Sequence, residues 1–223
     1  MIRFSVQEVE FGNSLPFVLI AGPCQLESRD HAMFMAEKIF TICSSLQISW
    51  VFKSSFDKAN RTSLHGKRGI GIDNALPILA EIKNNFNCPV ITDMHVASQA
   101  KILEEVIDII QIPAFLCRQT DLLMEAGDTK CAVNIKKGQF IAPWDIKNAV
   151  IKVNHSGNKK VMLTERGSCF GYNQLINDMK SIQIMAEETK CPIIFDATHS
   201  VQQPSGLGNS SGGNRKFIKT LAK

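Results

Sequence analysis

The sequence predicts an α/β fold, a TIM (β/α)8 barrel of which seven strands lie within the 223 residues. The first observation is a series of short apolar runs that each end abruptly on charged or polar residues. The runs span residues 17–21, 50–52, 90–92, 109–112, 132–135, 161–163 and 193–195. Continuous apolar runs are typical of parallel strands, because helices cover both faces of a parallel sheet. The second observation is that helical patterns alternate with these runs, as they do in a barrel.

Each gap between two runs has the periodicity of an amphipathic helix. The predicted helices span residues 30–46, 74–86, 98–106, 119–125, 145–153 and 173–189, and residues 212–223 read as the opening of a seventh. Ser28 is a suitable N-cap for the first helix, since its hydroxyl can accept a bond from the first turn. Ahead of the first run, residues 4–6 and 9–11 predict a small hairpin within residues 1–15. At this length the chain, 1–223, is expected to be a single barrel domain.

A doubly wound open sheet is the alternative architecture. It would place a Gly-rich phosphate-binding loop after the first strand. Residues 21–24 read Ala-Gly-Pro-Cys, and Pro23 lacks the backbone N–H that such a loop uses. The barrel is therefore favoured. Because barrels typically need about 250 residues, the eighth strand and last helix are expected to be absent from this sequence, which would leave two open sheet edges, a tendency to aggregate and little activity.

Composition excludes several classes of protein. The net charge is +4, from 25 basic and 21 acidic residues, which is too small for a nucleic-acid-binding surface. Seven cysteines without a Cys-x-x-Cys pair indicate buried thiols in a reducing compartment. The N-terminus has no signal-peptide pattern, and no apolar stretch approaches the ~20 residues that span a bilayer. We therefore expect a cytoplasmic protein that binds neither nucleic acid nor membrane.

Cations follow several of the predicted strands. Lys53, Lys58 and Arg61 lie in one hydroxyl-rich loop after the second run, and Lys136 and Arg166 come shortly after two other runs. The carboxyl ends of barrel strands meet at one rim, and lysine and arginine bind phosphate and carboxylate groups. The sequence therefore predicts a site for an anionic small molecule that carries two such groups.

Metal ligands or acid–base groups also follow the strands, at Cys24, Asp93, His95, Asp196 and His199. Thiolate and imidazole together suit zinc or iron, but a catalytic metal needs at least three protein ligands. A lone cysteine or histidine is more often a packed or hydrogen-bonded core residue, so both interpretations stay open. Residues 206–213 form a Gly-rich loop that is either a lid over the site or a disordered connection.

Five segments together resemble the 3-deoxy-D-manno-octulosonate 8-phosphate synthase family. They are residues 20–28 (with Ile-Ala-Gly-Pro-Cys), 52–61 (Phe-Lys-Ser-Ser-Phe-Asp-Lys-Ala-Asn-Arg), 110–121, 134–139 and 195–202 (Phe-Asp-Ala-Thr-His-Ser-Val-Gln). The resemblance implies a barrel fold, a homotetramer when complete, and a transferase. Its reaction condenses phosphoenolpyruvate with D-arabinose 5-phosphate to give 3-deoxy-D-manno-octulosonate 8-phosphate and phosphate, for the Kdo of lipopolysaccharide.

The resemblance also implies roles for single residues. Cys24 stands where metal-independent members carry Asn, which implies a divalent metal (Zn, Fe or Mn) held by Cys24 and His199. The other two implied ligands are a Glu and an Asp that family members carry after their last strand, beyond residue 223. The expected phosphoenolpyruvate contacts are Lys53, Ser55, Lys58, Lys136 and Arg166. The expected aldose contacts are Asn60, Arg61, Thr62, Asp93, His95 and, from a neighbouring subunit, Arg118, with Gln202 near the metal. Lys53, Lys58, Asp93 and His199 are the expected catalytic residues.

Two other functions remain open. One is a 3-deoxy-heptulosonate phosphate synthase-like enzyme that uses erythrose 4-phosphate, although residues 59–63 (Ala-Asn-Arg-Thr-Ser) favour the five-carbon sugar. The other is an inactive remnant that keeps the binding loop but lacks a complete rim.

Overall fold

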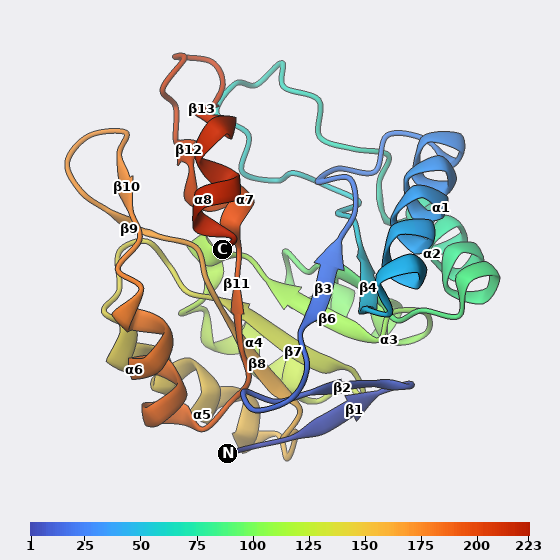
Figure 1. Ribbon diagram of the computed structural model, residues 1–223, viewed down its shortest axis with the longest axis horizontal. Coiled ribbons are helices and arrows are strands. Elements are labelled where there is room, and N and C mark those ends of the chain that lie inside the picture. Colours follow the sequence, from blue (N-terminus) through green and yellow to red (C-terminus); the bar gives the residue numbers. More distant parts are fainter.

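The computed structural model describes residues 1–223 and contains a curled sheet of parallel strands with helices on its outside (Figure 1). The seven strands run in the order β11-β8-β7-β6-β5-β4-β3. Their bounds are β3 Val18–Ala21, β4 Ser49–Lys53, β5 Val90–Asp93, β6 Ile109–Ile112, β7 Ala132–Lys136, β8 Val161–Glu165 and β11 Ile193–Phe195. Every predicted run coincides with one of these strands. The TIM-barrel-like α/β fold is therefore confirmed, with β3 and β11 as the two edges of the sheet.

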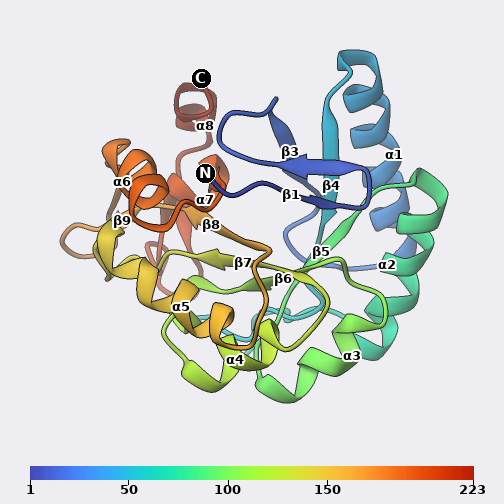
Figure 2. The same ribbon diagram turned by 90° about the horizontal axis from the view of Figure 1, so that it is seen from below.

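Helices follow the strands and cover the outer face of the sheet (Figure 2). They are α1 Arg29–Leu46, α2 Ile72–Phe86, α3 Ala100–Glu104, α4 Thr120–Gly127, α5 Lys147–His155, α6 Lys180–Thr189, α7 Ala197–Ser200 and α8 Ile218–Leu221, with short 3-10 turns at Ala97–Gln99, Ala114–Leu116, Pro143–Ile146 and Arg215–Phe217. Ser28 caps α1 as predicted, because its Oγ accepts a bond from the backbone N–H of His31 at 3.3 Å.

The prediction of a helix over residues 173–189 is wrong in its first part. Helix α6 begins only at Lys180, where Asp178 Oδ1 accepts a bond from the Lys180 backbone N–H at 3.1 Å. Before it, strand β10 (Leu175–Ile176) pairs antiparallel with β9 (Ser168–Cys169). Asn173 has a left-handed backbone with φ of 56°, which turns the chain between these strands and is incompatible with a continuing helix.

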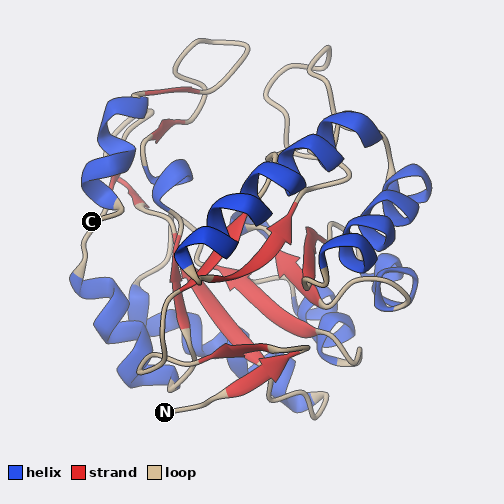
Figure 3. Cartoon of the chain, turned by 45° about the vertical axis from the view of Figure 1, so that its right-hand side comes forward, coloured by secondary structure: helices blue, strands red, loops and turns tan.

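The interpretation of residues 212–223 as one helix also needs correction. Gly212–Gly213 form strand β13, which pairs with β12 (Gln202–Gln203), so α8 starts later, at Ile218. The loop of residues 206–213 is consequently part of a hairpin that projects from the barrel rim rather than an unstructured connection (Figure 3).

The inner wall of the barrel changes from apolar to polar along each strand. Strand side chains alternate between faces, and one face carries the buried apolar residues Val51, Ile91, Ile109, Ala132 and Met162. The predicted hairpin, β1 (Phe4–Val6) paired with β2 (Val9–Phe11), packs against this layer and closes the lower end. Two positions further on, the same face carries Lys53, Asp93, Gln111, Asn134 and Thr164. The barrel therefore presents its chemistry at the carboxyl ends of the strands.

The cysteines are distributed as expected. Five are buried (Cys43, Cys88, Cys117, Cys131 and Cys191), two are exposed (Cys24 and Cys169), and all seven are free thiols. None of the helices combines the length and the apolar character that a bilayer crossing requires.

Candidate active site

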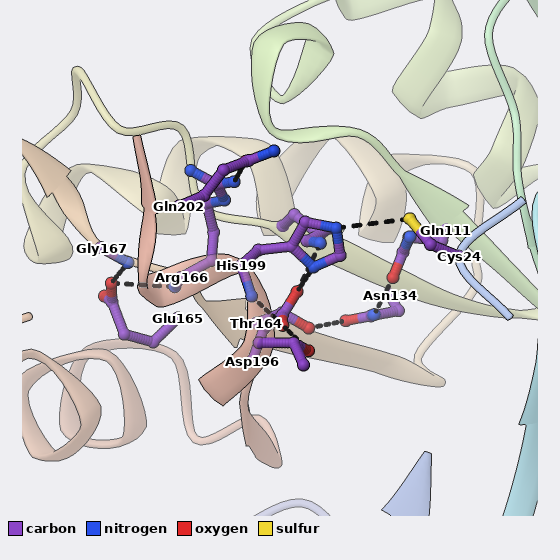
Figure 4. Close-up of polar contacts among 12 residues, drawn as sticks. Cys24, Gln111, Asn134, Thr164, Glu165, Arg166, Gly167, Asp196, His199 and Gln202 are labelled. Atoms are coloured by element: carbon purple, nitrogen blue, oxygen red, sulfur yellow. Dashed lines mark hydrogen bonds and ion pairs between the residues drawn. The ribbon is translucent and has the colours of Figure 1, made fainter. Parts of the chain in front are cut away.

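The two edge strands are joined by a chain of contacts at the rim. Cys24 follows β3, and His199 lies on α7, directly after β11. His199 Nε2 lies 3.5 Å from Cys24 Sγ, and its Nδ1 lies 2.8 Å from Asp196 Oδ2 (Figure 4). Asp196 also caps α7 by accepting a bond from the His199 backbone N–H at 3.0 Å. Lys136 Nζ donates to Asp196 Oδ2 at 2.6 Å, so the chain extends to β7.

This environment favours the ionised forms of Cys24 and Asp196. Partial desolvation of the sulfur raises the pKa of Cys24, but the hydrogen bond to His199 and the charges of Lys58 and Lys53 outweigh it and lower the pKa to about 6. Burial also raises the pKa of Asp196, yet the charge of Lys136 holds it well below its ordinary value. At neutral pH Cys24 is therefore largely a thiolate, which is the form that binds metals.

Cys24 and His199 suit a metal ion as two of its ligands. A ligating histidine usually donates its second ring N–H to a carboxylate, and Asp196 occupies that position on His199. No group of three or more His, Cys, Asp or Glu residues is arranged to hold a metal ion. The donor chemistry therefore fits a soft or borderline metal, with these two residues supplying part of its coordination.

A second cluster surrounds Asp93 at the end of β5. Lys58 Nζ lies 3.3 Å from Asp93 Oδ2, and Asp93 is only 6% exposed. Burial raises the pKa of Asp93, but the charges of Lys53, Lys58 and Lys136 outweigh it and hold the pKa far below its ordinary value. Burial lowers the pKa of Lys53, but the charges of Asp93, Cys24 and Asp196 raise it overall. Lys53, Lys58 and Lys136 thus balance the negative charges of Asp93, Asp196 and the Cys24 thiolate.

Arg166 adds a fourth cation with free donors. Its side chain is buried, and its Nη2 donates to Gln202 Oε1 at 3.2 Å. Its Nε and Nη1 are buried and have no hydrogen-bond partner. Glu165 holds the backbone in place, because its Oε1 accepts bonds from the N–H groups of Arg166 and Gly167 at 2.9 and 2.6 Å (Figure 4). Buried donors normally have partners, so the two free nitrogens are suited to an anion.

The loop between β4 and α2 carries Lys58 and four more of the predicted binding residues. Ser55 is buried, and its hydroxyl donates to the Asp57 carbonyl at 2.6 Å. Arg61 is exposed and donates from Nε to the Lys67 carbonyl at 2.8 Å, with a further bond to Gln25. Thr62 Oγ1 lies 3.4 Å from Ser205 Oγ in the β12–β13 hairpin, and Asn60 is exposed beside them. This loop therefore meets the hairpin above the rim.

The structure brings His95 to the site but leaves Arg118 apart. His95 packs edge-on against Phe56 with ring centroids 5.3 Å apart, and its Nδ1 is buried without a partner. Burial lowers the pKa of His95, so the neutral imidazole is favoured. Arg118 is exposed, and its backbone carbonyl accepts a hydrogen bond from Lys152 Nζ at 2.9 Å. Within one chain, Arg118 bonds to none of the other predicted residues.

A cavity of about 1380 Å³ opens between the two edge strands of the sheet. Cys24, Lys53, Asp196, His199 and Gln202 line its upper end, and residues of β3, β11, α6 and α8 line the rest. The cavity therefore lies mainly between the edge strands, and Lys53 is the one cation of the site that lines it.

Sequence reasoning missed five buried polar residues of this region, Gln111, Asn134, Lys137, Thr164 and Glu165. Three of them lie inside the segments that carried the family resemblance. A usable signal was present: Gln111 and Asn134 interrupt apolar runs, and Asn134 lies two positions before Lys136, on the same face of its strand.

Comparison with known proteins decides the family. The sequence model described as "DAHP synthetase I family" matches residues 1–223. The chain belongs to this family. Among its relatives, the "2-dehydro-3-deoxyphosphooctonate aldolase" proteins of Rickettsia rickettsii (strain Sheila Smith) and Rickettsia conorii (strain ATCC VR-613 / Malish 7) are 58% identical over 218 residues. That of Rickettsia bellii (strain OSU 85-389) is 57% identical over 218 residues. Each alignment covers 98% of this chain and 79% of the relative. The resemblance found in the sequence motifs is therefore confirmed.

Proposed function

We propose that this member of the DAHP synthetase I family condenses phosphoenolpyruvate with D-arabinose 5-phosphate and releases phosphate. The product is 3-deoxy-D-manno-octulosonate 8-phosphate, the sugar acid that the name of the relatives describes as a 2-dehydro-3-deoxyphosphooctonate. The observation that carries the proposal is 58% identity to those relatives over 98% of the chain. The site supports it independently, because both substrates are anionic and the rim is rich in cations.

Phosphoenolpyruvate fits the buried part of the site. Its phosphate and carboxylate groups need cationic donors, and Lys53, Lys58, Lys136 and Arg166 are available there. The two unpartnered guanidinium nitrogens of Arg166 are the most direct support. Charge-assisted bonds of this kind are the strong ones. Fixing both ends of the substrate would also align its C3 for attack, and such positioning can contribute several kcal/mol.

We place the aldose phosphate in the exposed part of the site. Asn60, Arg61 and Thr62 come from the loop beside the β12–β13 hairpin, and His95 lies with its neutral ring below them. Arg118 would reach the sugar phosphate from a neighbouring subunit of a homotetramer, which accounts for its distance from the site within one chain.

The reaction forms one carbon–carbon bond and adds one water. C3 of phosphoenolpyruvate attacks the aldehyde carbon of the sugar, positive charge develops at C2, water adds there, and phosphate leaves. The ionised carboxylates of Asp93 and Asp196 lie in the same interior, where fixed negative charge stabilises a positive centre. Lys53 and Lys58 keep the two anionic ends of the substrate neutralised while the new bond forms.

We further propose that Cys24 and His199 hold a divalent metal, of which Zn, Fe and Mn are the candidates. When bound, it would supply a Lewis acid that polarises the aldehyde or orients and acidifies water. Asp196 would fix the ring of His199 for this role. The seven free cysteines support a reducing location, which we take to be the cytoplasm.

The assay that tests this function measures phosphate release from phosphoenolpyruvate with each aldose phosphate. We expect faster turnover with arabinose 5-phosphate than with erythrose 4-phosphate. The matching family is described as a DAHP synthetase family, so faster turnover with erythrose 4-phosphate would replace our assignment by that activity. Absence of release with both sugars would leave the chain as an inactive relative.

The two substrate pockets can be separated by single substitutions. We expect Arg61→Ala to raise the KM for the aldose phosphate more than that for phosphoenolpyruvate, and Lys136→Ala to do the reverse. Loss of one charged contact to a phosphate costs roughly 1.5–3 kcal/mol, about tenfold or more in affinity. Steady-state kinetics with each substrate varied in turn gives both values.

Lys67→Ala is the matched control for Arg61→Ala. Lys67 is a cation of the same loop, but it contacts Arg61 through its backbone carbonyl, which alanine retains. Its KM values should stay near those of the wild type. If Arg61→Ala and Lys136→Ala affect both KM values equally, the two pockets are assigned wrongly.

A further inference from the structure

A row of buried polar side chains crosses four neighbouring strands on the inner wall of the barrel. Asp93 on β5, Gln111 on β6, Asn134 on β7 and Thr164 on β8 are 6%, 3%, 2% and 2% exposed. The sheet register places Asp93 opposite Gln111, and Gln111 opposite Asn134. Gln111 Nε2 donates to Asp93 Oδ1. Asn134 Nδ2 donates to Gln111 Oε1 at 3.1 Å, and Thr164 Oγ1 donates to Asn134 Oδ1 at 2.8 Å (Figure 4).

The carboxylate at one end fixes the direction of every bond in this row. An ionised Asp93 can only accept, so Gln111 must present its amide N–H to it. The carbonyl oxygen of Gln111 is then free to accept from the amide of Asn134, whose own oxygen accepts from the hydroxyl of Thr164. All donors therefore point toward Asp93, and hydrogen bonds aligned in this way strengthen one another.

The two oxygens of Asp93 have different partners. Oδ1 is tied to Gln111 within the barrel wall, whereas Oδ2 lies 3.3 Å from Lys58 Nζ, which comes from the loop after β4. With Oδ1 held, the carboxylate cannot turn away from Lys58. The wall of the barrel thus determines where Lys58, a cation of the loop after β4, is held.

We propose that Gln111, Asn134 and Thr164 are positioning residues, which act by holding Asp93 in the orientation that pairs with Lys58. For catalysis, this inference rests on the proposed condensation. The inference predicts that a change at one end of the row affects the residue at the other end. Thr164 lies three strands away from Asp93 in the sheet order, yet loss of its hydroxyl should reach Lys58 through the row.

The chain offers a matched control for the hydroxyl of Thr164. Thr92 lies on β5 next to Asp93, is 0% exposed, and has a hydroxyl without any hydrogen-bond partner. Thr→Val replaces a hydroxyl by a methyl group of similar size. The substitution therefore removes a bond of the row at position 164 and removes no bond at position 92.

The kinetic test compares Thr164→Val, Thr164→Ser and Thr92→Val. We expect Thr164→Val to lower kcat/KM on the order of fivefold, as for loss of one hydrogen bond. Thr164→Ser, which keeps the hydroxyl, and Thr92→Val should both stay near the wild-type value. Equal rates for Thr164→Val and the wild type, or equal losses for the two valine variants, would overturn the proposal.

A double-mutant cycle tests whether Thr164 acts through Asp93. In an Asp93→Asn background the charge that the row serves is gone, so adding Thr164→Val should lower kcat/KM less than twofold, well below its effect in the wild type. An unchanged fivefold loss in that background would mean that Thr164 acts by another route.

A readout without turnover separates this inference from the proposed reaction. The carboxyl ¹³C NMR signal of Asp93, assigned by its loss in Asp93→Asn, should move in Thr164→Val and stay in place in Thr92→Val. That result would support the row even if neither aldose phosphate is a substrate. An unmoved Asp93 signal in Thr164→Val would refute the row while leaving the condensation assignment untouched.

Discussion

Removal of divalent metal with a chelator should abolish the phosphoenolpyruvate-dependent release of phosphate, and adding back a divalent cation should restore it. The expectation follows from the paired donors at the rim. Cys24 Sγ and His199 Nε2 lie 3.5 Å apart, the thiol has its pKa lowered to about 6, and Asp196 fixes the second nitrogen of the imidazole. Thiolate and oriented imidazole together select soft or borderline divalent metals.

Cys24→Asn should weaken metal binding sharply. Changes to groups that only support a metal ligand typically cost 10–100-fold in affinity, so loss of a ligand should cost at least about 100-fold. Competition with a chromophoric chelator measures this affinity without turnover. Cys169→Ser is the matched control, because Cys169 is the other exposed thiol. This substitution should leave the metal affinity unchanged. Full activity after exhaustive chelation would contradict the metal proposal.

The strands were predictable because most of their outward and lower inward positions are apolar. The runs at residues 109–112 and 193–195 coincide with β6 and β11. Strands β7 and β8 extend past their predicted runs to Lys136 and Glu165. Polar side chains there are buried in the barrel, and their backbone pairing continues, so a hydrophobicity pattern stops short of the true strand end.

The sequence indicated which residues gather at the rim, but it did not indicate which of them pair with one another. Charged residues after each strand indicated one cationic rim, and the barrel gathers them. Lys136 and Asp196 form their ion pair across 60 residues of sequence, and only the curvature of the sheet determines that pairing. The early part of the predicted helix at 173–189 failed for a local reason, since Asn173 adopts a left-handed conformation that apolar periodicity does not detect.

Breaking the ion pair between Lys137 and Glu165 should have the largest effect on stability. The Lys137 side chain is fully buried and that of Glu165 is 2% exposed, with Nζ 3.6 Å from Oε2. Lys137 Nζ also donates to Ser168 Oγ at 3.1 Å, and Ser181 Oγ donates to Glu165 Oε2 at 2.7 Å. Removal of one partner from a buried pair leaves an uncompensated charge, which costs about 3–5 kcal/mol.

We therefore expect Lys137→Met to lower the free energy of unfolding by about 3–5 kcal/mol, measured by urea denaturation followed by circular dichroism. The double variant Lys137→Met/Glu165→Gln should recover part of this loss, because it removes the unpaired charge while an amide oxygen at position 165 can still accept from the Arg166 and Gly167 backbone. A double variant that is less stable than Lys137→Met would mean that the hydrogen bonds of Glu165, rather than the stranded charge, determine the loss.

Lys101→Met provides the comparison at equal separation. Lys101 Nζ also lies 3.6 Å from a carboxylate, that of Glu104, but its side chain is 59% exposed. Water screens such a pair and solvates whichever partner remains, so the urea midpoint should be nearly unchanged. Equal losses of unfolding free energy in Lys101→Met and Lys137→Met would show that burial does not determine how much stability is lost when the pair is broken. The Lys137–Glu165 pair would then contribute no more to stability than an exposed ion pair.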